Sequence, residues 1–174
     1  MVRGFGIVEV LLVVALAALL ALLAVPGLRT LQANSATVVE EQRVLALLRL
    51  ARSRATTART DTVLCPLAAV AATPQCGDAF GGWLLFRDGN GDGRFRADAD
   101  ELLRLERTGA RRSLQVLGRG GDPFSAAITY RADGTVRRPA TLRLCVSGAT
   151  RSRRLVVSMT GRVRRVRGEA ACAA

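Results

Sequence analysis

The stretch from Arg3 to Leu28, RGFGIVEVLLVVALAALLALLAVPGL, decides the fold of this chain. After Gly4 it is almost wholly apolar, and it carries one acid, Glu9. About 20 apolar residues are enough for a helix to cross the hydrocarbon core of a bilayer. A carboxylate inside such a run is costly, by roughly 2.5–3.5 kcal/mol on insertion scales, so Glu9 is a candidate functional residue. Pro26 is expected to kink this helix or to loosen one of its hydrogen bonds.

The residues after the apolar run continue the helix with a different pattern. One face carries apolar residues at spacings of four and three, which is typical of an amphipathic helix; they are Val44, Leu48, Ala51 and Ala55. The simplest interpretation is one helix, roughly from Phe5 to Thr57. We therefore divide it into a membrane or filament-core half at 5–28 and an amphipathic half at 29–59, followed by a globular β-rich head at 60–174.

The head has the composition of short strands and turns. Residues 66–82 contain two prolines and three glycines and are expected to form a loop. The expected strands are Thr62–Cys65, ended by Pro66, then Trp83–Phe86, Leu102–Leu105, Leu114–Leu117, Ala127–Tyr130, Thr135–Arg137, Thr141–Val146, Leu155–Met159 and Arg162–Val166. Closely spaced strands with tight turns predict a mostly antiparallel sheet. The predicted fold class is α+β, with a long N-terminal helix packed on an antiparallel β-sheet head.

Composition limits the chemistry that the chain can perform. Of its 174 residues 26 are basic, all of them arginine, and 14 are acidic, which gives a formal net charge of +12. This charge fits a polyanionic partner better than a cationic one, although charge alone does not establish nucleic-acid binding. The absence of histidine removes the commonest general base and most zinc sites. With no nucleophile motif or paired-carboxylate cleft in evidence, we expect no enzymatic activity, no cofactor and no metal site.

The four cysteines, Cys65, Cys76, Cys145 and Cys172, permit three pairings. An even number behind a membrane-targeting helix indicates an oxidising compartment. Proximity in the sequence favours Cys65–Cys76 and Cys145–Cys172. The alternative is that they are free thiols, buried as small apolar residues.

Residues Asp88, Asn90, Asp92 and Gly93 match the opening of a calcium-binding loop. Such a loop requires a bidentate acid at its twelfth position, which here is Ala99. Asp, Asn and Gly are also the residues that a tight turn favours. The segment is therefore interpreted as a structural turn, with calcium binding as the alternative.

The order glycine, phenylalanine and, four residues further on, glutamate resembles the class III signal of type IV pilins and type II secretion pseudopilins. In that family a dedicated prepilin peptidase cuts after the glycine and methylates the new N-terminus. The resemblance implies a leader at 1–4, cleavage between Gly4 and Phe5, and an ion pair between Glu9 and the N-terminal amine of an adjoining subunit. Such a pair gives register more surely than stability. The alternatives are a simple membrane anchor or uncleaved secretory signal, and a protonated Glu9 without a role.

Motifs in the head resemble one branch of this superfamily, the GspH/FimT branch. They are a cysteine-proline strand, the pattern G-G-W-x-x-F-x-D-x-N-x-D-G at residues 81–93, a distal cysteine strand, and G-R-x-R at residues 161–164. Members are minor pilins or pseudopilins found near filament tips. The resemblance implies a single pass through the inner membrane, then a periplasmic or cell-surface pilus, with other pilins or pseudopilins as partners.

The C-terminal region is rich in arginine and contains no acid between Asp133 and Glu169. Guanidinium groups suit phosphate geometry, and several together give salt-sensitive, sequence-independent binding. The predicted contact residues are Arg151, Arg153, Arg154, Arg162, Arg164, Arg165 and Arg167. In a strand, Arg162 and Arg164 share one face, whereas Arg165 and Arg167 can line the opposite face or a following loop.

FimT-like proteins with a C-terminal G-R-x-R are implicated in DNA capture during natural transformation. The resemblance therefore implies a FimT-like minor pilin that binds the backbone of extracellular DNA without sequence preference. One alternative is an arginine-rich, solvated edge strand that discourages aggregation. In that case the chain would be a GspH-like minor pseudopilin, a structural tip subunit of a type II secretion system.

Overall fold

The structure is a computed structural model that describes residues 6–68, 73–77, 80–107, 112–117 and 127–167. Helix α1, Ile7–Ala58, is 52 residues long and continues through Pro26 without a break. It ends at Arg59, whose φ of 51° is left-handed. The single long helix predicted from the sequence is confirmed. The predicted cleavage site at Gly4 and Phe5 lies outside the described residues.

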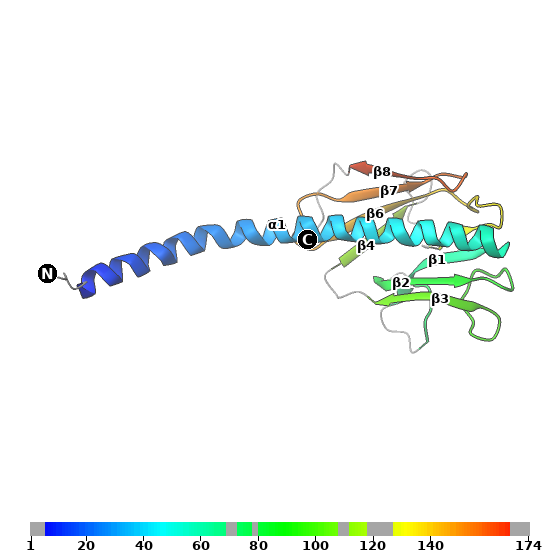
Figure 1. The fold of residues 1–174 in the computed structure, drawn as a ribbon, viewed down its shortest axis with the longest axis horizontal. Coiled ribbons are helices and arrows are strands. Elements are labelled where there is room, and N and C mark those ends of the chain that lie inside the picture. The colour runs from blue at the N-terminus through cyan, green and yellow to red at the C-terminus, as the bar shows by residue number, and fades with distance from the viewer. Residues whose placement is uncertain (1–5, 69–72, 78–79, 108–111, 118–126, 168–174) are drawn as a thin grey trace.

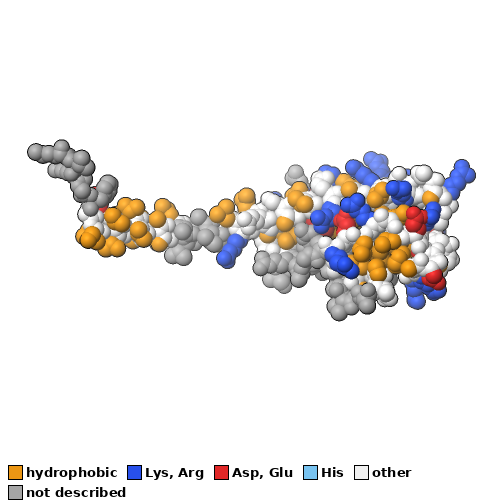
Figure 2. Space-filling view, turned by 60° about the horizontal axis from the view of Figure 1, so that its bottom comes forward, with side chains coloured by type: hydrophobic (Ala, Val, Ile, Leu, Met, Phe, Trp, Pro, Cys, Tyr) orange, Lys and Arg blue, Asp and Glu red, His pale blue; other side chains and the backbone are white. Residues whose placement is uncertain are grey.

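The first half of α1 extends away from the head, and its second half lies across it (Figure 1). Large apolar side chains on the first half, such as Ile7, Leu11 and Leu20, are exposed. Figure 2 shows apolar side chains along the free part of the helix, with a separate apolar patch on the head. Within the described part of the chain, no helix has the length and apolar character that crossing a membrane requires.

The head contains two four-stranded sheets. The first has the order β3 (Glu101–Arg107), β2 (Phe80–Arg87), β1 (Thr62–Ala68), β5 (Ile128–Tyr130). The second has the order β4 (Arg112–Leu117), β6 (Ala140–Val146), β7 (Arg153–Val157), β8 (Val163–Arg167). The strand pairs within both sheets are antiparallel. The predicted α+β class is confirmed, with two sheets where the sequence indicated one.

Pro66 does not end the first strand, so that prediction was wrong. β1 continues to Ala68, and Pro66 lies opposite Trp83 in β2. β5 pairs only with Thr62–Leu64, so β1 has no β5 partner beyond Leu64, and the register of β1 becomes irregular just after the proline. Beside Pro66 the place of β5 is taken by residues 75–77, and the Gly77 amide donates to the Pro66 carbonyl at 3.0 Å. Irregular pairing is where a sheet tolerates proline, which has no N–H to donate. The loop predicted at 66–82 is correspondingly shorter, because β2 begins at Phe80.

Thr135–Arg137 was also predicted as a strand, and it forms only an isolated bridge between Val136 and Tyr130. The Val136 amide donates to the Met159 carbonyl, at 3.0 Å, and not to a neighbouring strand. Met159 itself lies beyond the end of β7, because the Ser158 amide turns back to the Arg162 carbonyl, at 3.0 Å. The Arg137 amide donates to the Thr129 carbonyl of β5 at 3.0 Å, so the backbone of this region joins β5 by a short bridge and also contacts the turn after β7.

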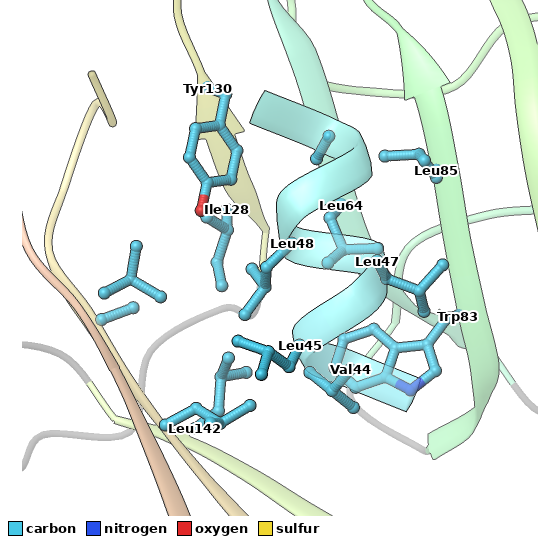
Figure 3. Close-up of a cluster of buried hydrophobic side chains, with 14 of the residues drawn as sticks. Val44, Leu45, Leu47, Leu48, Leu64, Trp83, Leu85, Ile128, Tyr130 and Leu142 are labelled. Carbon is cyan, nitrogen blue, oxygen red and sulfur yellow. The ribbon is translucent and has the colours of Figure 1, made fainter. Parts of the chain in front are cut away.

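The core lies between α1 and the two sheets (Figure 3). The predicted buried face of the helix is confirmed, because Val44, Leu48, Ala51 and Ala55 are all 0% exposed. They pack in one cluster with residues of both sheets, including Trp83 and Leu142. The Trp83 indole Nε1 donates to the Glu40 carboxylate, at 3.3 Å. The helix therefore holds the two sheets together.

A disulfide joins Cys65 in β1 to Cys76, with an S–S distance of 2.02 Å. This predicted pair is confirmed, and no described cysteine is a free thiol. The second predicted pair, Cys145–Cys172, stays a prediction, because Cys172 lies outside the described residues.

Tyr130 is fully buried, and its hydroxyl has no hydrogen-bond partner. Burial raises the pKa of Tyr130 to about 12, and the nearby Arg52 guanidinium opposes this rise. It is the only tyrosine, so tyrosinate absorbance during an alkaline titration reports this group alone. We expect a midpoint near pH 12. A midpoint near pH 10, the ordinary value, would contradict the burial.

The same shift gives the stability a pH dependence. The pKa of Tyr130 is higher in the folded state than in the unfolded state. Its contribution to the free energy of unfolding is therefore complete below about pH 10 and is lost as the pH rises towards about 12. The matched control is Tyr130→Phe, which removes the titration and an unpaired buried hydroxyl. It is expected to be neutral or slightly stabilising in urea denaturation at pH 7.

Candidate nucleic-acid interface

The arginine-rich hairpin of β7 and β8 closes through the turn at Ser158–Arg162. The Gly161 amide donates to the Ser158 carbonyl at 2.9 Å, and Gly161 has a φ of +73°. The Arg52 guanidinium of α1 donates to the Gly161 carbonyl, at 3.4 Å. The glycine of the G-R-x-R motif is therefore part of the turn that positions the following strand.

One side of this hairpin faces α1. Arg165 lies opposite the buried Leu155 and donates to the Gln42 side-chain oxygen at 2.9 Å. Arg153 forms an ion pair with the buried Glu41 at 3.9 Å. These two predicted contact residues therefore have partners on the helix.

The other side of the hairpin faces away from the core. Arg164 is exposed and lies opposite Val156, and Arg162 is exposed on the same side by strand alternation. Arg154 is half-buried and lies opposite Val166. The division of Arg162 and Arg164 from Arg165 agrees with the alternation expected from the sequence.

The last two predicted contact residues lie outside both groups. Arg151 is exposed and precedes β7. The backbone of Arg167 lies opposite that of Arg153. The structure therefore does not gather the seven predicted residues on one surface.

One further basic residue, which the sequence analysis did not include among the contacts, lies on the outer side of the sheet. Arg143 in β6 alternates with the buried Leu142 and Leu144 and is directly opposite Arg154 in β7. The only available signal in the sequence was this alternation, because the register between β6 and β7 cannot be read from it.

The second sheet carries no negative charge to balance these arginines. Its four strands contain no aspartate or glutamate, and they contain no aromatic residue. Glu41, which pairs with Arg153 of the hairpin, lies on the side that faces α1. The outer side is therefore a basic surface without groups for base stacking.

The segment Asp88–Gly93 folds as a turn whose carboxylates accept backbone amides. Buried Asp88 accepts from the amides of Gly91 and Gly93, at 2.8 and 2.9 Å. The Arg94 amide donates to Asp92 and is the main cause that lowers the pKa of this carboxyl. Across the described residues, no three side chains suited to a metal ion come together. These contacts fit the interpretation as a structural turn.

Comparison with protein families identifies the chain. The model of the family described as "Type II transport protein GspH" matches residues 40–161. The chain belongs to the GspH family. A comparison with curated proteins gave no match.

Two solved structures have the fold of this GspH-family chain. The type IV minor pilin FimU of Pseudomonas aeruginosa is 20% identical, with a TM-score of 0.51 and coverage of 80% of this chain and 94% of FimU. The minor pseudopilin EpsH from the type 2 secretion system of Vibrio cholerae is 14% identical, with a TM-score of 0.50 and coverage of 78% and 96%. The predicted pilin-like fold is confirmed.

The GspH-family match ends at Gly161, so it includes the turn and stops before β8. The family match therefore covers the scaffold up to the hairpin turn. The arginines at 162–167 have to be interpreted from their own geometry.

Proposed function

We propose that this GspH-family chain is a FimT-like minor pilin of a type IV pilus that binds extracellular DNA for natural transformation. A prepilin peptidase would cleave between Gly4 and Phe5, and the apolar half of α1 would anchor the chain by a single pass in the inner membrane before assembly. Glu9 would set the register with the N-terminus of a neighbouring pilin. The head would then be carried to the periplasm or cell surface.

The observation that carries the DNA-binding proposal is the exposed pair Arg162 and Arg164 on a sheet whose strands contain no acid. Guanidinium groups bind phosphate oxygens through paired N–H donors. Without aromatic residues on these strands, the contact is with the backbone and not with stacked bases. Binding would therefore be independent of sequence and steeply dependent on salt.

The second candidate function is that of a GspH-like minor pseudopilin, a structural tip subunit of a type II secretion system. The family description and the similarity of fold to EpsH favour it. In that case the arginines of β8 keep an exposed edge strand soluble. Both candidates are filament subunits without a catalytic step, and they differ in whether the purified protein binds DNA.

Arg162→Gln with Arg164→Gln is expected to weaken DNA binding and to make it less sensitive to salt. Each lost phosphate contact lowers the slope of log K against log salt by about 0.9 on duplex DNA, so the double variant should lower it by about 1.8. The measurement is a fluorescence-anisotropy salt series on the full chain in a non-ionic detergent.

The matched control is Arg49→Gln with Arg54→Gln, which removes the same charge from exposed positions on α1. Its salt slope is expected to equal that of the wild type. An equal loss in both variants would mean that net charge, and not this surface, determines binding. Absence of binding by the wild type would favour the pseudopilin function.

A further inference from the structure

We infer that Arg143, Arg154 and Arg164 form a row across the outer side of β6, β7 and β8, defined here as the arginine row, that binds the phosphodiester backbone of one DNA strand. The protein should therefore bind single-stranded DNA in addition to duplex DNA. The inference rests on the proposed DNA-binding function and adds Arg143 to its contact residues. It also separates these residues from Arg153 and Arg165, which contact α1.

The strand register brings these residues together from distant parts of the sequence. Arg143 is directly opposite Arg154, and Arg154 is opposite Val166, two residues along β8 from Arg164. Neighbouring strands are about 4.8 Å apart, so the row crosses about 10 Å of the sheet. Successive phosphates of one strand are 3.4 Å apart when measured along the duplex axis and roughly twice as far apart along the strand itself, so this distance accommodates about two of them.

The pairing of two cations at adjacent positions is itself unfavourable. Like charges directly opposite each other destabilise a sheet. No described acid pairs with Arg143, and its buried Nε atom has no hydrogen-bond partner. A phosphate group at Arg143 would supply a negative charge beside these two adjacent cations.

The side chains between the arginines point to the backbone as the ligand. On β6, β7 and β8 the other residues of the outer side include Thr141, Val156 and Val166, which offer neither aromatic rings for stacking nor an amide group for base edges. A row that reads only successive phosphates does not need the second strand of a duplex.

Arg153 and Arg165 provide a natural contrast because they lie on the opposite side. Arg153 pairs with Glu41 at 3.9 Å, and Arg165 donates to Gln42 at 2.9 Å. Removing Arg165 changes the net charge as much as removing Arg143 does. However, removing Arg165 leaves all three residues of the arginine row in place.

The test compares Arg143→Gln with Arg165→Gln in the full chain, in a non-ionic detergent, with single-stranded and duplex DNA of equal length. Arg143→Gln is expected to lower the salt slope by about 0.9 on duplex and about 0.7 on single-stranded DNA. Arg165→Gln is expected to leave both slopes at the wild-type value. A thermal melt shows whether each variant is folded.

If Arg143→Gln does not fold, Thr141→Glu replaces it, because this variant adds an acid beside Arg143 on the same side. It is expected to weaken binding to both DNA forms, and unchanged binding would overturn the inference. Wild-type slopes for Arg143→Gln, together with weaker binding by the Arg162→Gln and Arg164→Gln double variant, would overturn the arginine row and leave the proposed function standing. Binding to duplex DNA alone would overturn the single-strand contact. Failure of the wild type to bind either form would overturn the proposed function itself.

Discussion

Gly161→Ala is expected to lower the free energy of unfolding by about 3 kcal/mol. Gly161 has a φ of +73°, a left-handed conformation that costs other residues about 1–2 kcal/mol. A Cβ atom there would lie 2.1 Å from the carbonyl oxygen of Gly134, a backbone atom that cannot rotate away. Crowding of this kind adds about 1–3 kcal/mol. Urea denaturation followed by circular dichroism measures the change.

Gly91→Ala is the matched control for this effect. Gly91 has nearly the same φ, +78°, but a Cβ there meets no atom within 4 Å. The free energy of unfolding of Gly91→Ala should fall only by the conformational cost of about 1–2 kcal/mol. Equal destabilisation of the two variants would show that the approach of Gly161 to Gly134 is unimportant. The comparison separates the structural role of the glycine in G-R-x-R from the proposed role of its arginines.

Trp83→Ala is expected to lower the free energy of unfolding by about 4 kcal/mol, the range for removing a large aromatic side chain from a core. Trp83 is 1% exposed and packs in the cluster that joins α1 to both sheets. Figure 3 shows its indole beside Val44 and Leu47 of the helix. Because this is the only tryptophan, unfolding has to be followed by far-ultraviolet circular dichroism and not by fluorescence.

Trp83→Phe separates packing from the hydrogen bond to Glu40. The phenyl ring keeps much of the apolar contact and loses the indole N–H, while Glu40 keeps its ion pair with Arg43 at 3.5 Å. The expected loss is about 1.5–3 kcal/mol, the cost of one hydrogen bond to a charged group. If Trp83→Ala lowered the free energy of unfolding no more than Trp83→Phe does, the core packing inferred around the indole would be wrong.

The elements formed by local contacts could be predicted from the sequence. The helix follows from a continuous apolar run and a regular apolar face, which ends at Ala55, within one turn of its observed end at Ala58. Trp83–Phe86 and Leu102–Leu105 lie inside observed strands, because the residues at Asp88–Gly93, which favour a turn, separate them. Cys65 and Cys76 are close in sequence, and proximity selected the right partner.

The features that depend on distant pairing could not be predicted in this way. Pro66 has the sequence signature of a strand breaker, but β5 stops pairing at Leu64, and the segment beside Pro66 uses only its carbonyl, which accepts from the Gly77 amide. The division into two sheets depends on strand order, which local patterns do not encode. For the same reason the opposition of Arg143 and Arg154 was hidden, although strand alternation alone correctly separated Arg164 from Arg165.

The contacts of residues 40–42 with the head have a geometric consequence for a filament. Glu40 bonds to Trp83, Glu41 to Arg153 and Gln42 to Arg165, so the head is locked at one rotational setting about a helix without interruption. Each helical residue turns the axis by about 100° and advances it by 1.5 Å. The number of residues of α1 that precede Glu40 therefore sets the angle about the helix axis at which the head, with its basic side, projects from a filament. Deleting one residue from this part of α1 would swing that side by more than a quarter of a turn.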